Sequence, residues 1–183
     1  CRHGDKGGND HAPPANSLFG RKVGIYGFAF IARCLVKLLK PFGAEIMTFA
    51  PEIDDGVLAE HGVVRAGSLE QLFGENSVVV NLAPLTAKTT DSVRLEHLRL
   101  LDAGEALVSV GRGPVINEND LITVAREGRV HFALDVFHEE PLPADSPLRG
   151  LRNVMLTPHR AGPTDDRMRD AGEFAAANLL AYV

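Results

Sequence analysis

The sequence predicts an α/β fold in which helices cover both faces of a doubly wound parallel sheet. From residue 21 onward, short apolar or β-branched runs alternate with helical stretches, the pattern of strands joined by helices. Each run is bounded by polar or glycine residues and is almost wholly apolar, as expected of strands buried on both faces. A chain of 183 residues is long enough to bury a sizeable core.

Six runs are expected to be strands and five stretches to be helices. The strands are expected at residues 22–26, 45–49, 77–81, 106–110, 131–135 and 153–157. The helices are expected at residues 28–39, 68–73, 95–101, 118–127 and 164–182. Ligands of such sheets bind at the carboxyl ends of the strands, so the residues at those ends are the candidates for chemistry.

Residues 1–20 are rich in Gly, Pro, Asn and Asp without apolar periodicity, which predicts an N-terminal arm before a single domain at 21–183. Cys1, His3 and His11 lie in this arm, but their spacing is not that of a metal site, so no metal is expected. The chain begins with Cys instead of Met, which suggests a fragment.

Composition and charge argue against several classes of protein. Hydrophobic residues make up 45% of the chain and charged residues 23%, close to the averages of globular proteins, which argues against a disordered chain. The formal net charge of −5, with scattered basic residues, gives no footprint for nucleic acid. No apolar run approaches the roughly 18 residues that cross a bilayer, and the N-terminus lacks a hydrophobic signal core. A cytoplasmic protein is expected.

The first strand is followed by a segment that resembles a damaged dinucleotide fingerprint. In Gly27-Phe28-Ala29-Phe30-Ile31-Ala32, only the first glycine of the pattern GxGxxG remains. Gly27 can make the tight turn, and a methyl group is tolerated at Ala32. The Cβ of Ala29 is expected to project where a pyrophosphate needs bare backbone, which would lower the affinity for a dinucleotide. Taken alone, the segment is equally compatible with a turn that binds no nucleotide.

The second strand lacks the acidic residue that usually holds the hydroxyl groups of the adenosine ribose. Ala50 occupies this place, and Pro51 follows. No Arg is expected beside it to receive a 2′-phosphate, so the choice between NAD and NADP stays open.

Three later strand ends each deliver one residue suited to proton and hydride chemistry on a small acid. Arg112 lies between two glycines, where its planar guanidinium can meet a carboxylate with two hydrogen bonds. Glu140 and His159 follow the next two predicted strands. Each residue taken singly is more often a solvated loop residue, so the argument rests on their combination.

The sequence segments around these residues resemble those of the NAD-dependent D-2-hydroxyacid dehydrogenase family. Over about residues 19 to 182, five motifs appear in family order and spacing: GRKVGIYGFAFIARCLVKLLKPFGAEIMTFAP, VVVNLAPLTAKT, ALVSVGRGPVINENDLI, HFALDVFHEEPLPADSPL and NVMLTPHRAG. The resemblance implies a Rossmann-type cofactor-binding domain of an oxidoreductase that moves a hydride between NAD(H) or NADP(H) and a small 2-hydroxy or 2-keto acid. It also implies a homodimer.

The resemblance further implies roles for the residues at the strand ends. His159 would exchange a proton with the substrate oxygen, and Glu140 would pair with His159 and favour the imidazolium. Arg112 would bind the substrate carboxylate and carbonyl. Asp135 would support the catalytic pair near the nicotinamide.

The cofactor would lie along residues that the family motifs place at the sheet edge. The resemblance puts Gly27, Phe28, Phe30 and Ile31 near the pyrophosphate, with Ala29 and Ala50 at the altered positions. It puts Ala83 and Pro84 near the adenine and ribose, and Val110, Gly111 and Arg112 near the nicotinamide ribose.

Relatives carry a substrate domain before this region, so the chain is expected to be a cofactor domain with negligible turnover alone. Helix 164–183 would return towards the missing substrate domain.

Two other functions are compatible with the sequence. A catalytically idle nucleotide-sensing or interaction module on the same fold is favoured by Ala29 and Ala50. Formate or phosphite oxidation is a third possibility, but the formate dehydrogenases pair their His with Gln, whereas this chain has Glu140.

Overall fold

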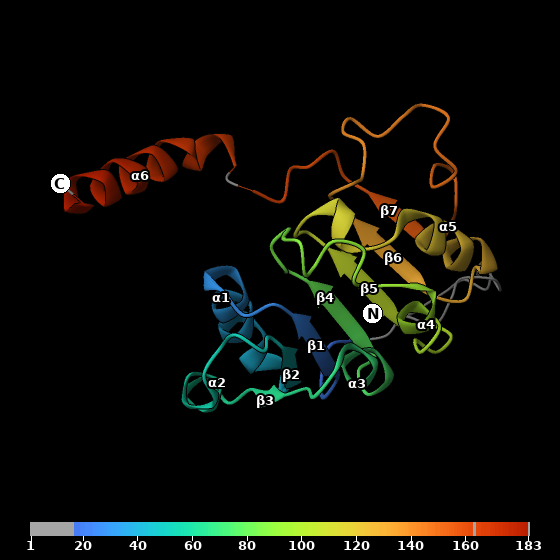
Figure 1. The fold of residues 1–183 in the computed structure, drawn as a ribbon, viewed down its shortest axis with the longest axis horizontal. Helices are drawn as coiled ribbons and strands as arrows, with labels where there is room; N and C mark the ends of the chain where they lie inside the picture. The colour runs from blue at the N-terminus through green and yellow to red at the C-terminus, as the bar shows by residue number, and fades with distance from the viewer. Residues whose placement is uncertain (1–16, 163, 183) are drawn as a thin grey trace, which may run out of the picture.

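The computed structural model describes residues 17–162 and 164–182 and contains a seven-stranded, all-parallel sheet (Figure 1). Cys1, His3 and His11, for which no metal is expected, and most of the expected arm lie outside the described residues. The spatial order is β3-β2-β1-β4-β5-β6-β7, the doubly wound order of a Rossmann fold. The strands are β1 (Lys22–Tyr26), β2 (Glu45–Phe49), β3 (Val64–Arg65), β4 (Val78–Asn81), β5 (Ala106–Ser109), β6 (His131–Leu134) and β7 (Val154–Leu156).

Helices cover both faces of the sheet and enclose two cores. The α-helices are α1 (Phe30–Leu39), α2 (Asp55–His61), α3 (Leu69–Gly74), α4 (Leu95–Leu98), α5 (Glu118–Glu127) and α6 (Met168–Tyr182), and short 3-10 turns lie at Lys40–Phe42, Gly113–Val115 and Asp165–Arg167. Along β4, Val79 belongs to the core under α3, α4 and α5, whereas Val80 belongs to the core under α1 and α2. Successive side chains of a strand point to opposite faces, so one buried strand contributes to both cores.

The turn from β1 into α1 shows why a glycine is needed at its first position. Gly27 has φ +87°, and a Cβ there would lie 3.0 Å from the Cα of Ala83. Helix α1 begins two residues later than expected, at Phe30, because Ala29 has extended backbone and acts as its N-cap. The side chain of Ala29 makes no capping bond, so no side chain caps the first N–H groups of α1.

Two elements between β2 and α3 are absent from the sequence expectation. Helix α2 is short and contains Gly56, although Asp54 caps it by accepting a hydrogen bond from the Gly56 N–H at 2.8 Å, and Gly62 ends it with φ +69°. Strand β3 has only two residues and one ladder, to β2. Elements this short give no periodic pattern to detect.

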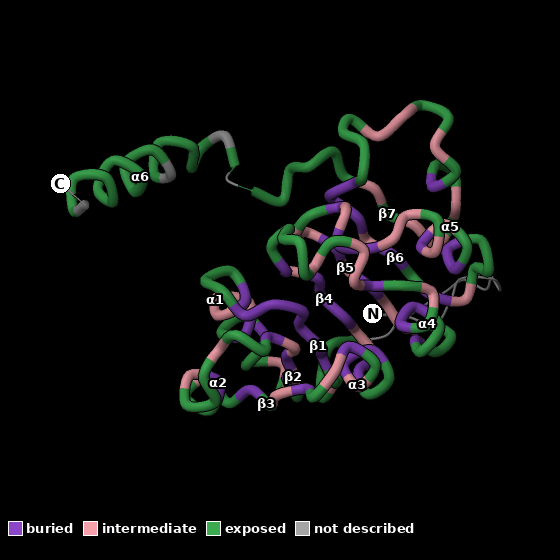
Figure 2. Tube along the Cα trace, in the orientation of Figure 1, coloured by how far each residue is buried: buried purple, intermediate pink, exposed green. Residues whose placement is uncertain are grey.

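Helix α6 extends away from the sheet, and its described side chains are exposed (Figures 1 and 2). Four of its large apolar side chains are exposed, namely Met168, Phe174, Leu179 and Leu180. Within residues 17–162 and 164–182, no helix combines the length and apolar character needed to span a bilayer.

Candidate functional site

The carboxyl ends of β5, β6 and β7 deliver Arg112, Glu140 and His159 to one edge of the sheet. These strands are neighbours in the sheet and run parallel, so the loops that follow them lie side by side. The sequence predicts that these three residues lie close together at the strand ends.

Glu140 and His159 form a hydrogen-bonded pair. The Nδ1 atom of His159 lies 2.5 Å from Oε2 of Glu140, and the side chains are 47% and 34% exposed. The other carboxylate oxygen, Oε1, accepts a hydrogen bond from the Phe137 N–H at 2.9 Å. The hydrogen bond from His159, then that from Phe137, lowers the pKa of Glu140, and the charge of Arg112 adds to this effect. The pair therefore holds an ionised carboxylate against the imidazole, and it turns the Nε2 side of the ring away from Glu140.

The backbone at His159 is held in an uncommon conformation. His159 has φ +51°, a region that residues other than glycine rarely adopt. Such conformations persist where neighbouring bonds impose them, and they occur often at functional sites.

Asp135 supplies these neighbouring bonds. Its Oδ1 accepts from the Thr157 hydroxyl at 2.5 Å and the Arg160 N–H at 2.8 Å, and its Oδ2 accepts from the Ala161 N–H at 2.8 Å. Burial of Asp135 raises its pKa, but the three hydrogen bonds and the nearby His159 outweigh this and leave it lowered. The carboxylate faces the loop 157–161, so Asp135 fixes the loop that carries His159.

Arg112 lies at the same edge of the sheet as Glu140 and His159, and its side chain is exposed. Its guanidinium donates to the Gly111 carbonyl at 2.8 Å, and its charge acts on Glu140. A Cβ at Gly111 would lie 2.9 Å from the Ala83 carbonyl oxygen, so glycine lets this loop approach the loop after β4.

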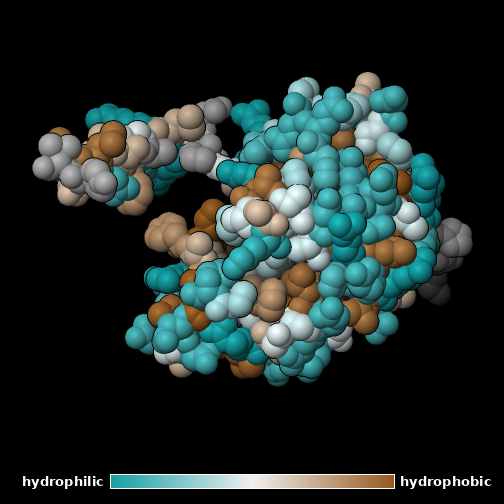
Figure 3. Space-filling view, viewed as in Figure 1, coloured by the Kyte–Doolittle hydropathy of each residue, from teal (hydrophilic) through white to brown (hydrophobic). Residues whose placement is uncertain are grey.

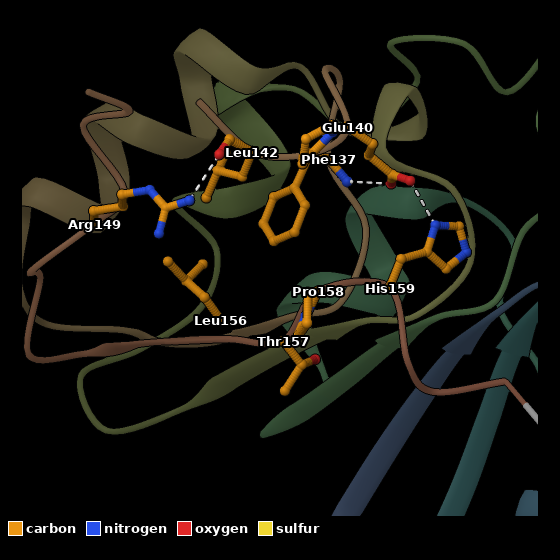
Figure 4. A pocket seen from close by; sticks show the side chains of 9 residues that line it. Phe137, Glu140, Leu142, Arg149, Leu156, Thr157, Pro158 and His159 are labelled. Atoms are coloured by element: carbon orange, nitrogen blue, oxygen red, sulfur yellow. Dashed lines mark hydrogen bonds and ion pairs between the residues drawn. The ribbon is translucent and has the colours of Figure 1, made fainter. Parts of the chain in front are cut away.

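A cavity of about 580 Å³ opens beside the Glu140–His159 pair. Its walls are mainly apolar and include Phe137, Leu142, Leu156 and Pro158, with the guanidinium of Arg149 at the far end from the pair (Figure 4). Arg149 donates to the carbonyls of Pro143 and Leu142 at 2.8 and 2.7 Å. These bonds join the two ends of the loop 142–149.

A second cavity, of about 590 Å³, lies where the ends of β1, β2 and β4 meet. It is lined by Tyr26, Gly27, Phe49, Pro51, Glu52, Ala83, Pro84, Thr86, Lys88 and Thr89. This is the point at which the strand order reverses, the usual place for a dinucleotide. Gly27, Ala83 and Pro84, three expected cofactor residues, thus line one cavity.

Two expectations about this region need correction. The side chain of Phe28 is 1% exposed and packs edge-on against His61, so only its backbone can face a pyrophosphate. Ala50 is also 1% exposed, and an Arg does stand beside it: the Arg65 guanidinium donates to the Ala50 carbonyl at 2.8 Å. Arg65 comes from β3, an element that the sequence expectation lacked.

The remaining expected cofactor residues surround the start of α1 and the end of β5. Phe30 and Ile31 are 76% and 64% exposed, and hydrophobic side chains gather where α1 begins (Figure 3). Val110 shares an apolar cavity of about 410 Å³ with Ile31. Ala29 is exposed at the N-terminus of α1 with φ −93°, a conformation that does not require glycine.

These residues fit a dinucleotide. Gly27 turns closely against the backbone of Ala83 and lines the second cavity, and the first turn of α1 has no side-chain cap, so its N–H groups can bind an anion. Among the described residues, no group of three or more His, Cys, Asp or Glu side chains could hold a metal ion.

Sequence reasoning missed a buried polar pair under the second cavity. The Asn81 amide donates to the Ser109 hydroxyl at 3.1 Å, and its oxygen accepts from the Ala83 N–H at 3.2 Å. Both side chains are almost fully buried. A polar residue that ends an apolar run, as Asn81 does after three valines, is the signal that could have revealed this pair.

Comparisons with known proteins agree with this geometry. The family described as "D-isomer specific 2-hydroxyacid dehydrogenase, NAD binding domain" has a model that matches residues 1–161. The glyoxylate reductase of Korarchaeum cryptofilum is 34% identical over 166 residues, which are 90% of this chain and 50% of that protein. The D-3-phosphoglycerate dehydrogenase of Methanocaldococcus jannaschii is 33% identical over 163 residues, which are 88% of this chain and 31% of that protein.

Solved structures share the fold. A phosphoglycerate oxidoreductase from Rhizobium etli superimposes with a TM-score of 0.81 at 27% identity, covering 96% of this chain and 56% of that chain. The chain spans half or less of the length of the two curated relatives.

Proposed function

Because the chain belongs to the NAD-binding domain family of the D-isomer specific 2-hydroxyacid dehydrogenases, we propose that it is the cofactor half of an oxidoreductase acting on small 2-hydroxy or 2-keto acids. Residues 21–183 would form this domain. The relatives named glyoxylate reductase and D-3-phosphoglycerate dehydrogenase support this substrate class.

The observation that carries the proposal is the hydrogen bond between His159 and Glu140 at the sheet edge. When bound, the nicotinamide supplies or accepts the hydride at C2 of the substrate. His159 donates a proton to the carbonyl oxygen in reduction and takes it back in oxidation. Glu140 stabilises the protonated imidazole, and Arg112 binds the substrate carboxylate and orients the carbonyl. Asp135 keeps His159 in position through the loop 157–161.

The experiment that tests the proposal measures cofactor binding and turnover separately. Calorimetric titration of the 183-residue chain is expected to show binding of NADH or NADPH. The protein that carries this chain together with its substrate-binding half is expected to oxidise the reduced cofactor when glyoxylate or hydroxypyruvate is added, followed by absorbance. Binding without turnover on any 2-keto acid would instead identify an idle nucleotide-sensing module, and the absence of both would refute the proposal.

We also propose that the protein is a cytoplasmic homodimer. Exposed apolar side chains on one side of α1, Ile31 and Leu38, together with Leu18, line an apolar cavity and support an association of two copies there. Light scattering that gives the mass of one chain, or fractionation that places the protein outside the cytoplasm, would contradict this.

A further inference from the structure

The cavity at the ends of β1, β2 and β4 contains a carboxylate at a position where the sequence pattern shows none. Ala50 holds the usual place of the ribose-binding acid, but its methyl group cannot accept a hydrogen bond and is buried. Two residues later, Glu52 has an exposed side chain that lines the cavity together with Gly27 and Phe49. The cavity therefore has a carboxylate, but it comes from a position two residues further along the β2–α2 loop than the usual one.

Arg65, a cation in contact with this loop, is already bound. Arg65 donates from Nε to the Asp55 carboxylate at 2.5 Å and from its terminal nitrogens to the carbonyls of Ala50 and Ile53. These bonds fix the loop that carries Glu52, and they leave the Arg65 guanidinium committed to a carboxylate and two carbonyls. A guanidinium held in this way is a poor receptor for a 2′-phosphate.

The charge of Glu52 acts on the wall of the cavity. Burial raises the pKa of Tyr26, its hydrogen bond with Ser92 opposes this, and the negative charge of Glu52 adds to the increase. The Tyr26 hydroxyl lies 3.0 Å from the Ser92 hydroxyl, so it is already partnered. Glu52 is the carboxylate among the residues that line this cavity, and Lys88, Thr86 and Thr89 line it as well.

We propose that Glu52 accepts hydrogen bonds from the adenosine ribose hydroxyls and thereby selects NAD(H) over NADP(H). This inference rests on the proposed function and adds a specificity-determining residue to it. A carboxylate accepts from both hydroxyls of a ribose, whereas it repels a phosphate at the 2′ position.

Calorimetric titration of NADH and NADPH tests the inference without any turnover. The unchanged protein should bind NADH at least about tenfold more tightly than NADPH, which corresponds to about 1.4 kcal/mol. Glu52→Gln should weaken NADH binding by about tenfold and leave NADPH binding unchanged or stronger, because the repulsion is removed. Glu45→Gln is the matched control: Glu45 is also exposed but lies at the opposite end of β2, so both affinities should stay as they were.

Three results would overturn the inference. Unchanged affinities in Glu52→Gln, with NADH still bound, would remove Glu52 from the site while leaving the proposed function intact. A preference for NADPH that is lost in Lys88→Met would assign the selection to the opposite wall of the cavity. Failure of the unchanged, folded protein to bind either nucleotide would refute the proposed function and the inference together, and a thermal melt of each variant establishes that it is folded.

Discussion

At the scale of single residues, the structure distinguishes His159, the proposed proton donor, from His131. His159 has its Nδ1 bonded to Glu140, whereas His131 is exposed at the beginning of β6, on the opposite edge of the sheet. His159→Ala removes the proposed proton donor and is expected to lower kcat by about 10²- to 10⁴-fold with little change in cofactor affinity. Steady-state assays with His131→Ala as the control check this. Equal rates for the two variants would show that His159 is not the acid.

Ala29 is a second residue whose role can be tested alone. Its backbone is extended and its side chain is exposed at the start of α1, so the methyl group lies where a pyrophosphate would approach the amides. Ala29→Gly should therefore strengthen NADH binding, and helix α1 should not be weakened because glycine is the better N-cap of the two. Calorimetry measures the change, with Ala103→Gly on an exposed turn as the control. Weaker binding in Ala29→Gly would contradict the steric explanation.

At the scale of elements, one carboxylate at the end of β6 holds the loop after β7. Asp135 is 3% exposed and accepts hydrogen bonds from Thr157, Arg160 and Ala161. Asp135→Asn places an N–H₂ group against a backbone donor, which should cost about 1–3 kcal/mol of unfolding free energy at neutral pH. Scanning calorimetry is expected to show a lower Tm for this variant, and the exposed Asp145→Asn should melt like the unchanged protein.

The same carboxylate predicts a pH dependence. The pKa of Asp135 is lowered in the folded protein, so its contribution to stability is complete above the ordinary Asp value of 3.8 and is lost as the pH falls through the lowered value. The difference in Tm between the unchanged protein and Asp135→Asn should therefore be largest near neutral pH and should shrink in acid. A difference that stays constant through this range would show that the Asp135 carboxylate does not titrate with folding.

The elements also show how far the sequence could predict the molecule. Arg112, Glu140 and His159 could be placed together because each follows a strand long enough to be recognised, and parallel strands end at one edge. The bonds by which Arg65 holds the loop that carries Glu52 could not be predicted, because Arg65 lies in β3, whose two residues carry no pattern. Likewise, nothing local indicates that Phe28 turns into the core against α2, a short helix with Gly56 in its first turn.

At the scale of the whole molecule, the two cavities belong to one edge whose loops are in close contact. Gly113, directly after Arg112, lies against the loop after β6, and a Cβ there would overlap the Phe137 carbonyl oxygen. Phe137 in turn donates to Glu140, so this contact sets the spacing between Arg112 and Glu140. A methyl group added at Gly113 would meet backbone atoms, which cannot rotate away as a side chain can, so the two loops would have to separate. The separation would change both the position of Arg112 relative to Glu140 and the stability of the sheet.

Gly113→Ala should therefore cost about 1–3 kcal/mol of unfolding free energy, a fall in Tm of about 2–12 °C for a domain of this size. It should also lower kcat/KM for the 2-keto acid, because Arg112 moves away from the Glu140–His159 pair. Gly74→Ala is the matched control: no atom lies within 4 Å of a Cβ at Gly74, the last residue of α3, where alanine is at least as favourable as glycine. If Gly113→Ala melted and turned over like Gly74→Ala, the loops after β5 and β6 would not be coupled, and Arg112 would reach the substrate independently of Glu140.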